Sequence, residues 1–333
     1  MTDQIQPISN VDPHARWKFI RDVGAFQLKL FLNNLHNFIQ IPLALGVAAV
    51  LISLQLYTPG SAHVIYRGRS FFGAFSVLQD DTRHERLFIH GATVHGVQSL
   101  EPGRRAEPMA YFTRSSPIGQ VFQAFSGTLA KSHVGIVGLG IGTLAAYGES
   151  PQWWTFFEID PALERLARDP RYFTYLADAR EHVRVVLGDA RISLRSEPAG
   201  GFGLLVLDAF SGDSVPVHLV TREALNLYLE KVDEHGVLLF NVSNRYLDLR
   251  PLLDALAKDA NLVALTEDDL VVSDEALRGG KLASRWVVMA RCKEDLGPIG
   301  HDPRWHPLST DRPLSVWTDD FSNLFALLKW HVS

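Results

Sequence analysis

The stretch His133–Tyr147 constrains the fold of this 333-residue chain more than any other. An apolar run, 134–137, leads into glycines at positions 138, 140 and 142, and an apolar, helix-like run follows. This pattern predicts a strand, a tight turn and the start of a helix. Glycines at such a turn let the backbone approach a ligand closely, and the first N–H groups of a helix are free to bind it. We therefore expect Gly138, Gly140 and Gly142 to bind a cofactor.

A carboxylate follows the next predicted strand. This apolar run, Trp153 to Phe157, ends at Glu158, which lies 18 residues after Gly140. An acid at this place in an open α/β sheet can bind the hydroxyls of a ribose. The segment 140–145 also fits the dinucleotide fingerprint G-x-G-x-x-A, which by itself permits several nucleotides. The pattern predicts a doubly wound α/β domain that binds a nucleoside-containing cofactor.

Two further acids stand at the ends of predicted strands. Asp189 follows the run 183–187, and Asp208 ends the run 203–208. Parallel strands present their carboxyl ends at one edge of the sheet, so we expect both acids to lie near Glu158. Such an array suits a cationic sulfonium nucleoside better than an anionic pyrophosphate, which carboxylates repel. This disfavours a nicotinamide-dependent dehydrogenase, and capping of the following helices remains the alternative role of each acid.

The second half of the chain alternates strand-like and helix-like runs, which predicts a mostly parallel sheet with helices on both faces. Pro161 and Thr221 are typical helix-start residues. The expected strands are 134–138, 153–158, 183–187, 203–208, 236–242, 262–266 and 285–290, and the expected helices are 119–129, 142–148, 161–168, 221–232 and 249–259.

A different pattern precedes the glycine stretch. From residue 63 onward, apolar residues alternate with polar ones, and short turn-like segments separate the runs. We expect strands at 63–67, 73–79, 86–90 and 93–97. The sequence therefore predicts a small antiparallel β domain at 61–112, followed by a nucleoside-binding domain at 113–333.

Residues 1–60 form a third region, with a hydrophobic segment at 38–57. No Asp, Glu, Lys or Arg occurs between Lys29 and Arg67. Twenty residues at about 1.5 Å each can cross a hydrocarbon core of roughly 30 Å, so this segment predicts a transmembrane helix. A buried or interfacial helix is the alternative. We expect a membrane-associated protein whose globular part is cytoplasmic, although basic residues on both sides leave the orientation open.

Composition excludes several classes of partner and site. The net charge is −5 and no basic block occurs, which argues against nucleic-acid binding. A single cysteine, Cys292, excludes an internal disulfide and a multi-cysteine zinc site. His90 and His95 are five residues apart, but a metal site would need further ligands, so we expect ordinary turn or pocket histidines. We expect no bound metal.

Several strings are similar to the spermidine synthase (polyamine aminopropyltransferase) family. The resemblance covers about residues 64–325, including the small β domain ahead of the nucleoside domain. The nucleoside-site strings are 134–142, 157–161, 185–190 and 205–208. The strings 90–98, 116–119, 208–218 and 316–323 resemble more closely the membrane-linked, transporter-fused members of this group.

This resemblance implies a class I S-adenosylmethionine-methyltransferase-like (Rossmann-like) fold with a seven-stranded sheet. The implied reaction moves an aminopropyl group from decarboxylated S-adenosylmethionine to a putrescine-like amine in polyamine biosynthesis and leaves methylthioadenosine. Glu158 would hold the ribose, Asp189 and Ala190 would lie by the adenine, and Asp208 would take the proton that the attacking amine must lose. The resemblance also implies a homodimer.

The residues that would hold the amine are less distinct. Family members usually carry an acid in the glycine loop, where this chain has Leu139 and Ile141, and Asp213 lies five residues after Asp208 rather than three. Packing and surface-turn roles remain open for His218 and the C-terminal acids. The substrate-binding candidates are Tyr111, Asp213, His218, Asp319 and Asp320.

Two other functions remain open. An S-adenosylmethionine-dependent methyltransferase would use the same fold and the same pocket. A non-catalytic, membrane-attached domain that binds a polyamine or a nucleoside would need no acid in the glycine loop. The product released from each sulfonium cofactor distinguishes these functions.

Overall fold

The computed structural model describes residues 62–333 except 92, 180–181, 210–215, 245 and 330–333. The chain divides into two units, 1–60 and 61–333, and all described residues belong to the second. The predicted transmembrane segment 38–57 lies outside the described residues and stays a prediction. Within the described ranges, no helix is both long enough and apolar enough to cross a membrane.

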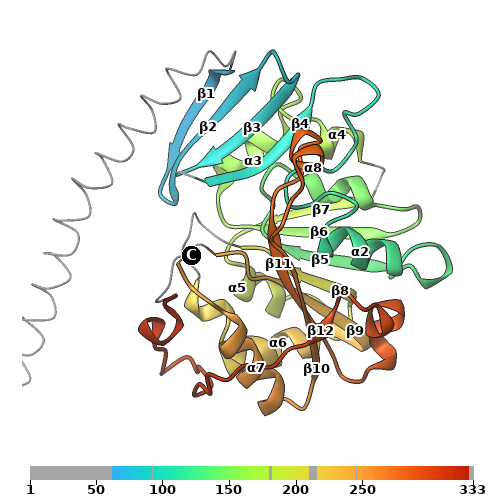
Figure 1. Ribbon diagram of the computed structural model, residues 1–333, viewed down its shortest axis with the longest axis vertical. Helices are drawn as coiled ribbons and strands as arrows, with labels where there is room; N and C mark the ends of the chain where they lie inside the picture. Colours follow the sequence, from blue (N-terminus) through green and yellow to red (C-terminus); the bar gives the residue numbers. More distant parts are fainter. Residues whose placement is uncertain (1–61, 92, 180–181, 210–215, 245, 330–333) are drawn as a thin grey trace, which may run out of the picture. The chain divides into compact units, whose positions relative to one another are not determined.

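The first sheet is a four-stranded antiparallel meander in the order β1-β2-β3-β4 (Figure 1). Its strands are β1 (Ala62–Ser70), β2 (Gly73–Asp80), β3 (Glu85–His90) and β4 (Thr93–Ser99). Phe75, Val77 and Phe88 on its inner face are buried against the segment 163–175 of the second sheet's domain. The period-two pattern therefore predicts the sheet correctly, because each strand buries only one face.

The second sheet has the order β12-β10-β11-β9-β8-β5-β6-β7. Strands β5 to β9 are mutually parallel, whereas β11, β10 and β12 each run antiparallel to their neighbour. All seven predicted strands are present. The strands of this second sheet are β5 (His133–Val137), β6 (Trp153–Glu158), β7 (Val183–Leu187), β8 (Phe202–Leu207), β9 (Val232–Asn241), β10 (Val263–Asp269), β11 (Ser284–Ala290) and β12 (His306–Pro307).

The predicted count of seven strands is thus too low for this sheet. The eighth strand, β12, pairs only two residues with the edge strand β10. A strand of two residues has no periodicity that a sequence pattern can reveal. The methyltransferase-like α/β architecture is unaffected, because β12 only extends one edge.

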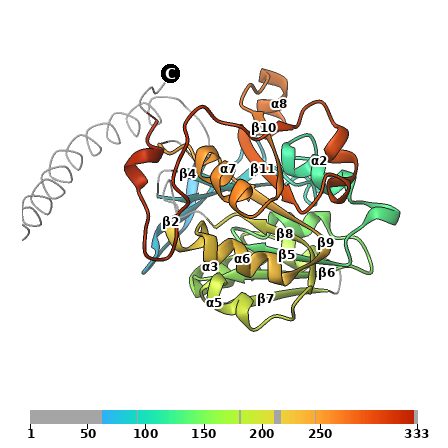
Figure 2. The ribbon, with the colours of Figure 1, turned by 90° about the horizontal axis from the view of Figure 1, so that it is seen from below.

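Two hydrophobic cores cover the two faces of this sheet. Figure 2 shows the ribbon of this sheet and its helices from below. Consecutive residues of β8 alternate between them: Leu205 and Leu207 pack into one core, Leu204 and Val206 into the other. The first core receives α5 (Ala190–Arg195), α6 (Arg222–Lys231) and α7 (Arg250–Asp259), and the second receives α2 (Pro117–Ala124) and η4 (Glu294–His301). Burial on both faces explains why these strands are continuously apolar.

The observed helices differ from the predictions in two places. The segment after the glycines is a 3₁₀-helix, η2 (Thr143–Tyr147), rather than an α-helix. The predicted helix 119–129 is α2 followed by a separate turn, η1 (Gly127–Leu129), because Gly127 adopts a left-handed conformation with φ of 58°. Other short helices are α3 (Pro161–Arg168), α4 (Tyr175–Asp178), η3 (Val217–Leu219), α8 (Asp274–Arg278) and η5 (Leu324–Leu327).

Candidate active site

A cavity of about 290 Å³ lies where the carboxyl ends of β5, β6 and β8 face the small sheet. The glycine loop, Glu158, Asp189 and Asp208 line it from the large sheet. The small sheet and its following segment contribute a mostly aromatic wall, made of Phe72, Phe88, His90, His95, Tyr111 and Phe112. The structure therefore brings together the acids that the sequence predicts at three strand ends, and it adds a wall from the first sheet.

The three glycines of the loop have positive φ values of 101°, 54° and 80°, and they have different roles. A Cβ on Gly138 would lie 2.3 Å from the carbonyl oxygen of Asp208, and one on Gly142 would lie 2.7 Å from Leu176. A Cβ on Gly140 would meet nothing closer than 3.9 Å. Close packing therefore requires Gly138 and Gly142, while Gly140 leaves space toward the cavity. Gly142 is not among the residues that line it.

Glu158 is held by backbone donors on both sides. Its two carboxylate oxygens accept from the N–H groups of Leu139, at 3.0 Å, and Asp160, at 2.8 Å. Burial raises the pKa of Glu158, and these backbone hydrogen bonds oppose that rise. Each oxygen retains a free lone pair, so the carboxylate can still accept from the two hydroxyls of a ribose. Asp160 in turn accepts from the hydroxyl of Ser70, which ties the small sheet to this strand end.

Asp189 also has both oxygens engaged. Oδ1 accepts from the N–H of Ile192 at 3.0 Å and caps α5, as the helix-capping alternative predicts. Oδ2 lies 2.9 Å from Nε2 of His218, another residue that lines the cavity. Ala190 is buried and lines the same region. Asp189 therefore both caps α5 and lines the cavity.

Asp208 follows β8, and the strands β5 and β6 separate β8 from β7, which precedes Asp189. Its Oδ1 accepts from the amide of Asn241 at 2.7 Å, and burial raises its pKa to about 7. Burial, together with the nearby charge on Asp208, raises the pKa of Tyr111 well above its ordinary value. A carboxylate that titrates near neutral pH can accept a proton from an incoming nucleophile.

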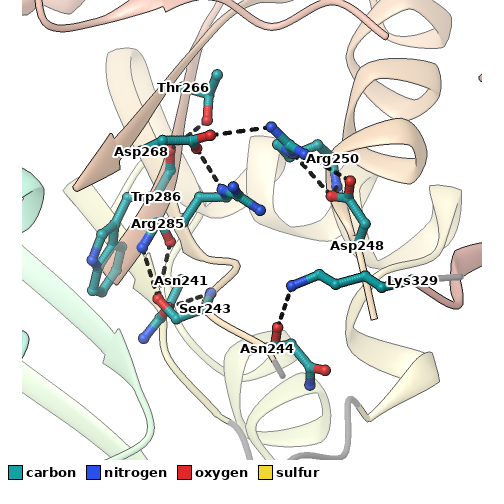
Figure 3. A network of polar contacts seen from close by, with 10 residues as sticks. All are labelled: Asn241, Ser243, Asn244, Asp248, Arg250, Thr266, Asp268, Arg285, Trp286 and Lys329. Carbon is teal, nitrogen blue, oxygen red and sulfur yellow. Dashed lines mark hydrogen bonds and ion pairs between the residues drawn. The ribbon is translucent and has the colours of Figure 1, made fainter. Parts of the chain in front are cut away.

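A polar network keeps Asn241 in place (Figure 3). Its Oδ1 accepts from the N–H of Ser243 at 2.9 Å, and the Ser243 hydroxyl accepts from the N–H of Arg285 at 2.8 Å. The guanidinium of Arg285 pairs with Asp268, which also pairs with Arg250. The side chain beside Asp208 is therefore anchored through three strands, β9, β10 and β11.

His90 and His95 both line the cavity. Their ring centroids are 6.1 Å apart in the aromatic wall, and burial lowers the pKa of His95 to about 4. A Cβ on Gly73 would lie 2.5 Å from Nε2 of His90, so this glycine makes room for the ring. Among the described residues, no group of three or more His, Cys, Asp or Glu could hold a metal ion. Sequence reasoning placed these histidines in a turn or pocket but did not include them in the site.

Some predicted substrate residues have other partners. Asp319 forms two hydrogen bonds with the guanidinium of Arg191, each 2.6 Å long, and it is not among the residues that line the cavity. Asp320 is exposed and is also absent from the lining. Asp213 lies outside the described residues. The residues that sequence reasoning missed are Phe72, Phe88, Phe112, Asp160 and Asn241, and only the position of Asp160 after Glu158 signalled a role.

Comparisons with known proteins were made at three levels. No protein-family model matches the chain. A polyamine aminopropyltransferase from Vibrio vulnificus (strain CMCP6) is 27% identical over 209 residues, which are 60% of this chain and 66% of that protein. The chain therefore spans just under two thirds of the length of this curated relative.

One solved structure with a TM-score above 0.5 has a similar fold. A probable spermidine synthase from Corynebacterium glutamicum aligns with a TM-score of 0.52 and 16% identity, covering 68% of this chain and 79% of that one. Spermidine synthase from Thermotoga maritima aligns with a TM-score of 0.49 and 14% identity, covering 77% and 81%. The link to membrane-fused members stays a prediction. The chain is thus similar in sequence to a curated polyamine aminopropyltransferase and similar in fold to a probable spermidine synthase.

Proposed function

We propose that this protein transfers an aminopropyl group from decarboxylated S-adenosylmethionine to an amine and releases methylthioadenosine. One observation carries the proposal: a partly buried carboxylate, Asp208, shares a cavity with the glycine loop and Glu158. This arrangement supports a base that acts beside a bound nucleoside. The similarity to a curated polyamine aminopropyltransferase supports the same reaction.

The nucleoside half of the site binds by prearranged geometry. Gly140 leaves room for the backbone to approach the ligand, and Glu158 offers lone pairs to the two ribose hydroxyls. Because backbone groups already hold the carboxylate, little side-chain entropy is lost on binding. Asp189 and Ala190 bound the end of the cavity where the base would lie.

The reaction half supplies a proton acceptor. The amine nitrogen attacks the aminopropyl carbon next to sulfur, a C–N bond forms and the C–S bond breaks. The sulfur leaves with the bonding electrons as the neutral thioether of methylthioadenosine, and the proton of the amine passes to Asp208. A pKa of about 7 leaves roughly half of this carboxylate ionised at neutral pH and makes it an effective general base.

The finer features belong to this proposal. The acceptor is a putrescine-like amine whose reacting nitrogen lies between Asp208 and Tyr111, and Asp213 is the further candidate for its distal end. The enzyme acts as a homodimer, is attached to a membrane through 38–57 and needs no metal, so treatment with EDTA should leave the rate unchanged. The low pKa of His95 keeps its imidazole neutral beside the cationic substrates.

A product assay tests the proposal. Purified protein is incubated with decarboxylated S-adenosylmethionine or with S-adenosylmethionine and a panel of amines that includes putrescine. We expect amine-dependent release of methylthioadenosine from the first cofactor only. Release of S-adenosylhomocysteine from the second would instead make the protein a methyltransferase. Binding of methylthioadenosine without turnover of either cofactor would make it a sensor.

A further inference from the structure

The base end of the cavity contains a pair of side chains rather than a lone acid. Nε2 of His218 lies 2.9 Å from Oδ2 of Asp189, and both residues line the cavity. The other oxygen of Asp189 is committed to the N–H of Ile192 at the start of α5. His218 therefore lies against the second oxygen of Asp189, and its side chain is 48% exposed.

A second contact fixes the backbone of His218. Nη1 of Arg191 donates to the His218 carbonyl oxygen at 3.0 Å. Arg191 comes two residues after Asp189, so one turn of the chain holds His218 by both its side chain and its backbone. This guanidinium is nearly buried, with 10% of the side chain exposed.

The C-terminal segment holds the guanidinium of Arg191 in position. Asp319 accepts two hydrogen bonds from Arg191 and a third, at 2.9 Å, from the hydroxyl of Thr221. The Arg191 guanidinium holds the pKa of Asp319 below its usual value. The chain therefore uses a buried arginine and a carboxylate 128 residues away to place one imidazole at the cavity wall.

We infer that His218 is a specificity-determining residue, which together with Asp189 selects a 6-aminopurine over a 6-oxopurine at the base end of the cavity. This inference rests on the proposed function. In the tautomer that donates from Nε2 to Asp189, the His218 ring keeps Nδ1 as an acceptor, so the pair presents acceptors to a ligand. An exocyclic amino group can donate to them. A 6-oxo group brings lone pairs instead and leaves the acceptors unpaired.

Calorimetric titration with methylthioadenosine and methylthioinosine tests this inference. We expect the native protein to prefer the adenosine compound by about tenfold or more, as for sites that hydrogen-bond a defined substrate group. His218→Ala should lower the affinity for methylthioadenosine about tenfold and change that for methylthioinosine less than about threefold. His218→Gln keeps a donor toward Asp189 and an acceptor beyond it, so it should restore most of the preference.

Two further variants separate recognition from folding. Asp319→Asn weakens the hold on Arg191 without touching the cavity, and we expect it to lower the preference about threefold. His301→Ala, at an exposed position outside the cavity lining, should leave both affinities unchanged. Thermal melting followed by circular dichroism checks that each variant is folded.

The outcomes distinguish the inference from the function beneath it. If His218→Ala is folded and keeps the native ratio of the two affinities, the inference is wrong while the proposed function stands. An equal loss of both affinities would mean that His218 has only a structural role, and this outcome would also contradict the inference. If the native protein binds neither nucleoside, the proposed function fails and the inference fails with it.

Discussion

Two carboxylates of the cavity, Glu158 and Asp208, have different hydrogen-bond partners. At the proposed ribose end, Glu158 accepts from backbone N–H groups on both oxygens. At the proposed reaction end, Asp208 accepts from one side-chain amide, that of Asn241. Burial raises the pKa of both acids, but at Glu158 backbone hydrogen bonds oppose the rise, whereas Asp208 reaches about 7.

This difference shows how one sheet edge can serve two purposes. A carboxylate held by backbone donors keeps its position and its lone pairs, which suits ligand binding. A carboxylate that is buried with few donors exchanges a proton near neutral pH, which suits catalysis. Substitutions at the two ends should therefore affect different steps.

The largest effect should come from Asp208→Asn. The amide keeps the size of the side chain but cannot accept the proton of the amine, so kcat should fall by about 10²-fold or more. The affinity for methylthioadenosine should change less than about threefold, because the ribose end is untouched. Rapid-quench product assays and calorimetry measure the two quantities. A variant with native turnover would remove Asp208 from the mechanism.

Glu158→Gln should affect the other end. One of the two oxygens that accept from backbone N–H groups becomes an amide nitrogen. The N–H groups of this amide then face a backbone N–H group, so two buried donors lie against each other. We expect the affinity for methylthioadenosine to fall by about 10- to 100-fold. The rate at saturating cofactor should fall much less. If instead the rate collapsed and the affinity held, the two ends would not be separate as described.

The glycine loop offers a matched pair of substitutions. Gly138→Ala places a methyl group 2.3 Å from the backbone of Asp208 and should lower the free energy of unfolding by about 2 kcal/mol or more. Gly140→Ala has open space and carries only the left-handed backbone cost of about 1–2 kcal/mol, but its methyl group points toward the ligand. Chemical denaturation should therefore show the larger loss of stability for Gly138→Ala, whereas ligand titration should show the larger loss of affinity for Gly140→Ala. Equal losses in both measurements would contradict the separate roles.

The smallest effects concern pH. The value of kcat/KM should rise with pH through about 7, as Asp208 loses its proton. Stability should change in the opposite sense. The folded state holds this proton more tightly than the unfolded state, whose pKa is near 3.8, so the contribution of Asp208 to stability falls as pH rises from about 4 to above 7.

Asp208→Asn removes this titration and provides the control. Between pH 5 and 8, the native protein should lose at most about 3 kcal/mol of unfolding free energy relative to this variant. Urea denaturation at both pH values measures the difference. Parallel pH dependences of the two proteins would show that the carboxyl titrates far from neutrality.

Local patterns predict much of this protein because their causes are local. The run into Gly138 and Gly140, and the acids that end strands near Glu158 and Asp208, follow from backbone geometry and from the common edge of parallel strands. The small sheet follows from one-sided burial. The two-residue strand β12 and the 3₁₀ geometry of η2 escape prediction, because neither leaves a repeated pattern.

Contacts across long sequence distances are a different matter. Asn241 lies 33 residues from Asp208, and Arg191 lies 128 residues from Asp319. No pattern in either segment signals its partner, since each pairing depends on the order of strands and on the path of the C-terminal segment. The aromatic wall around His95 depends in the same way on how the small sheet packs against the large one.

The sequence by itself thus determines the glycine loop and the acids that end the neighbouring strands, because strand, turn and helix signals are short-range. Only the tertiary structure decides what each acid does. Backbone donors hold Glu158 in place as an acceptor, whereas burial raises the pKa of Asp208 to about 7. The packing of the fold brings His218 within hydrogen-bond distance of Asp189. The physical reason is that pKa values and hydrogen-bond partners depend on the three-dimensional surroundings of a side chain, which the residue type alone does not specify.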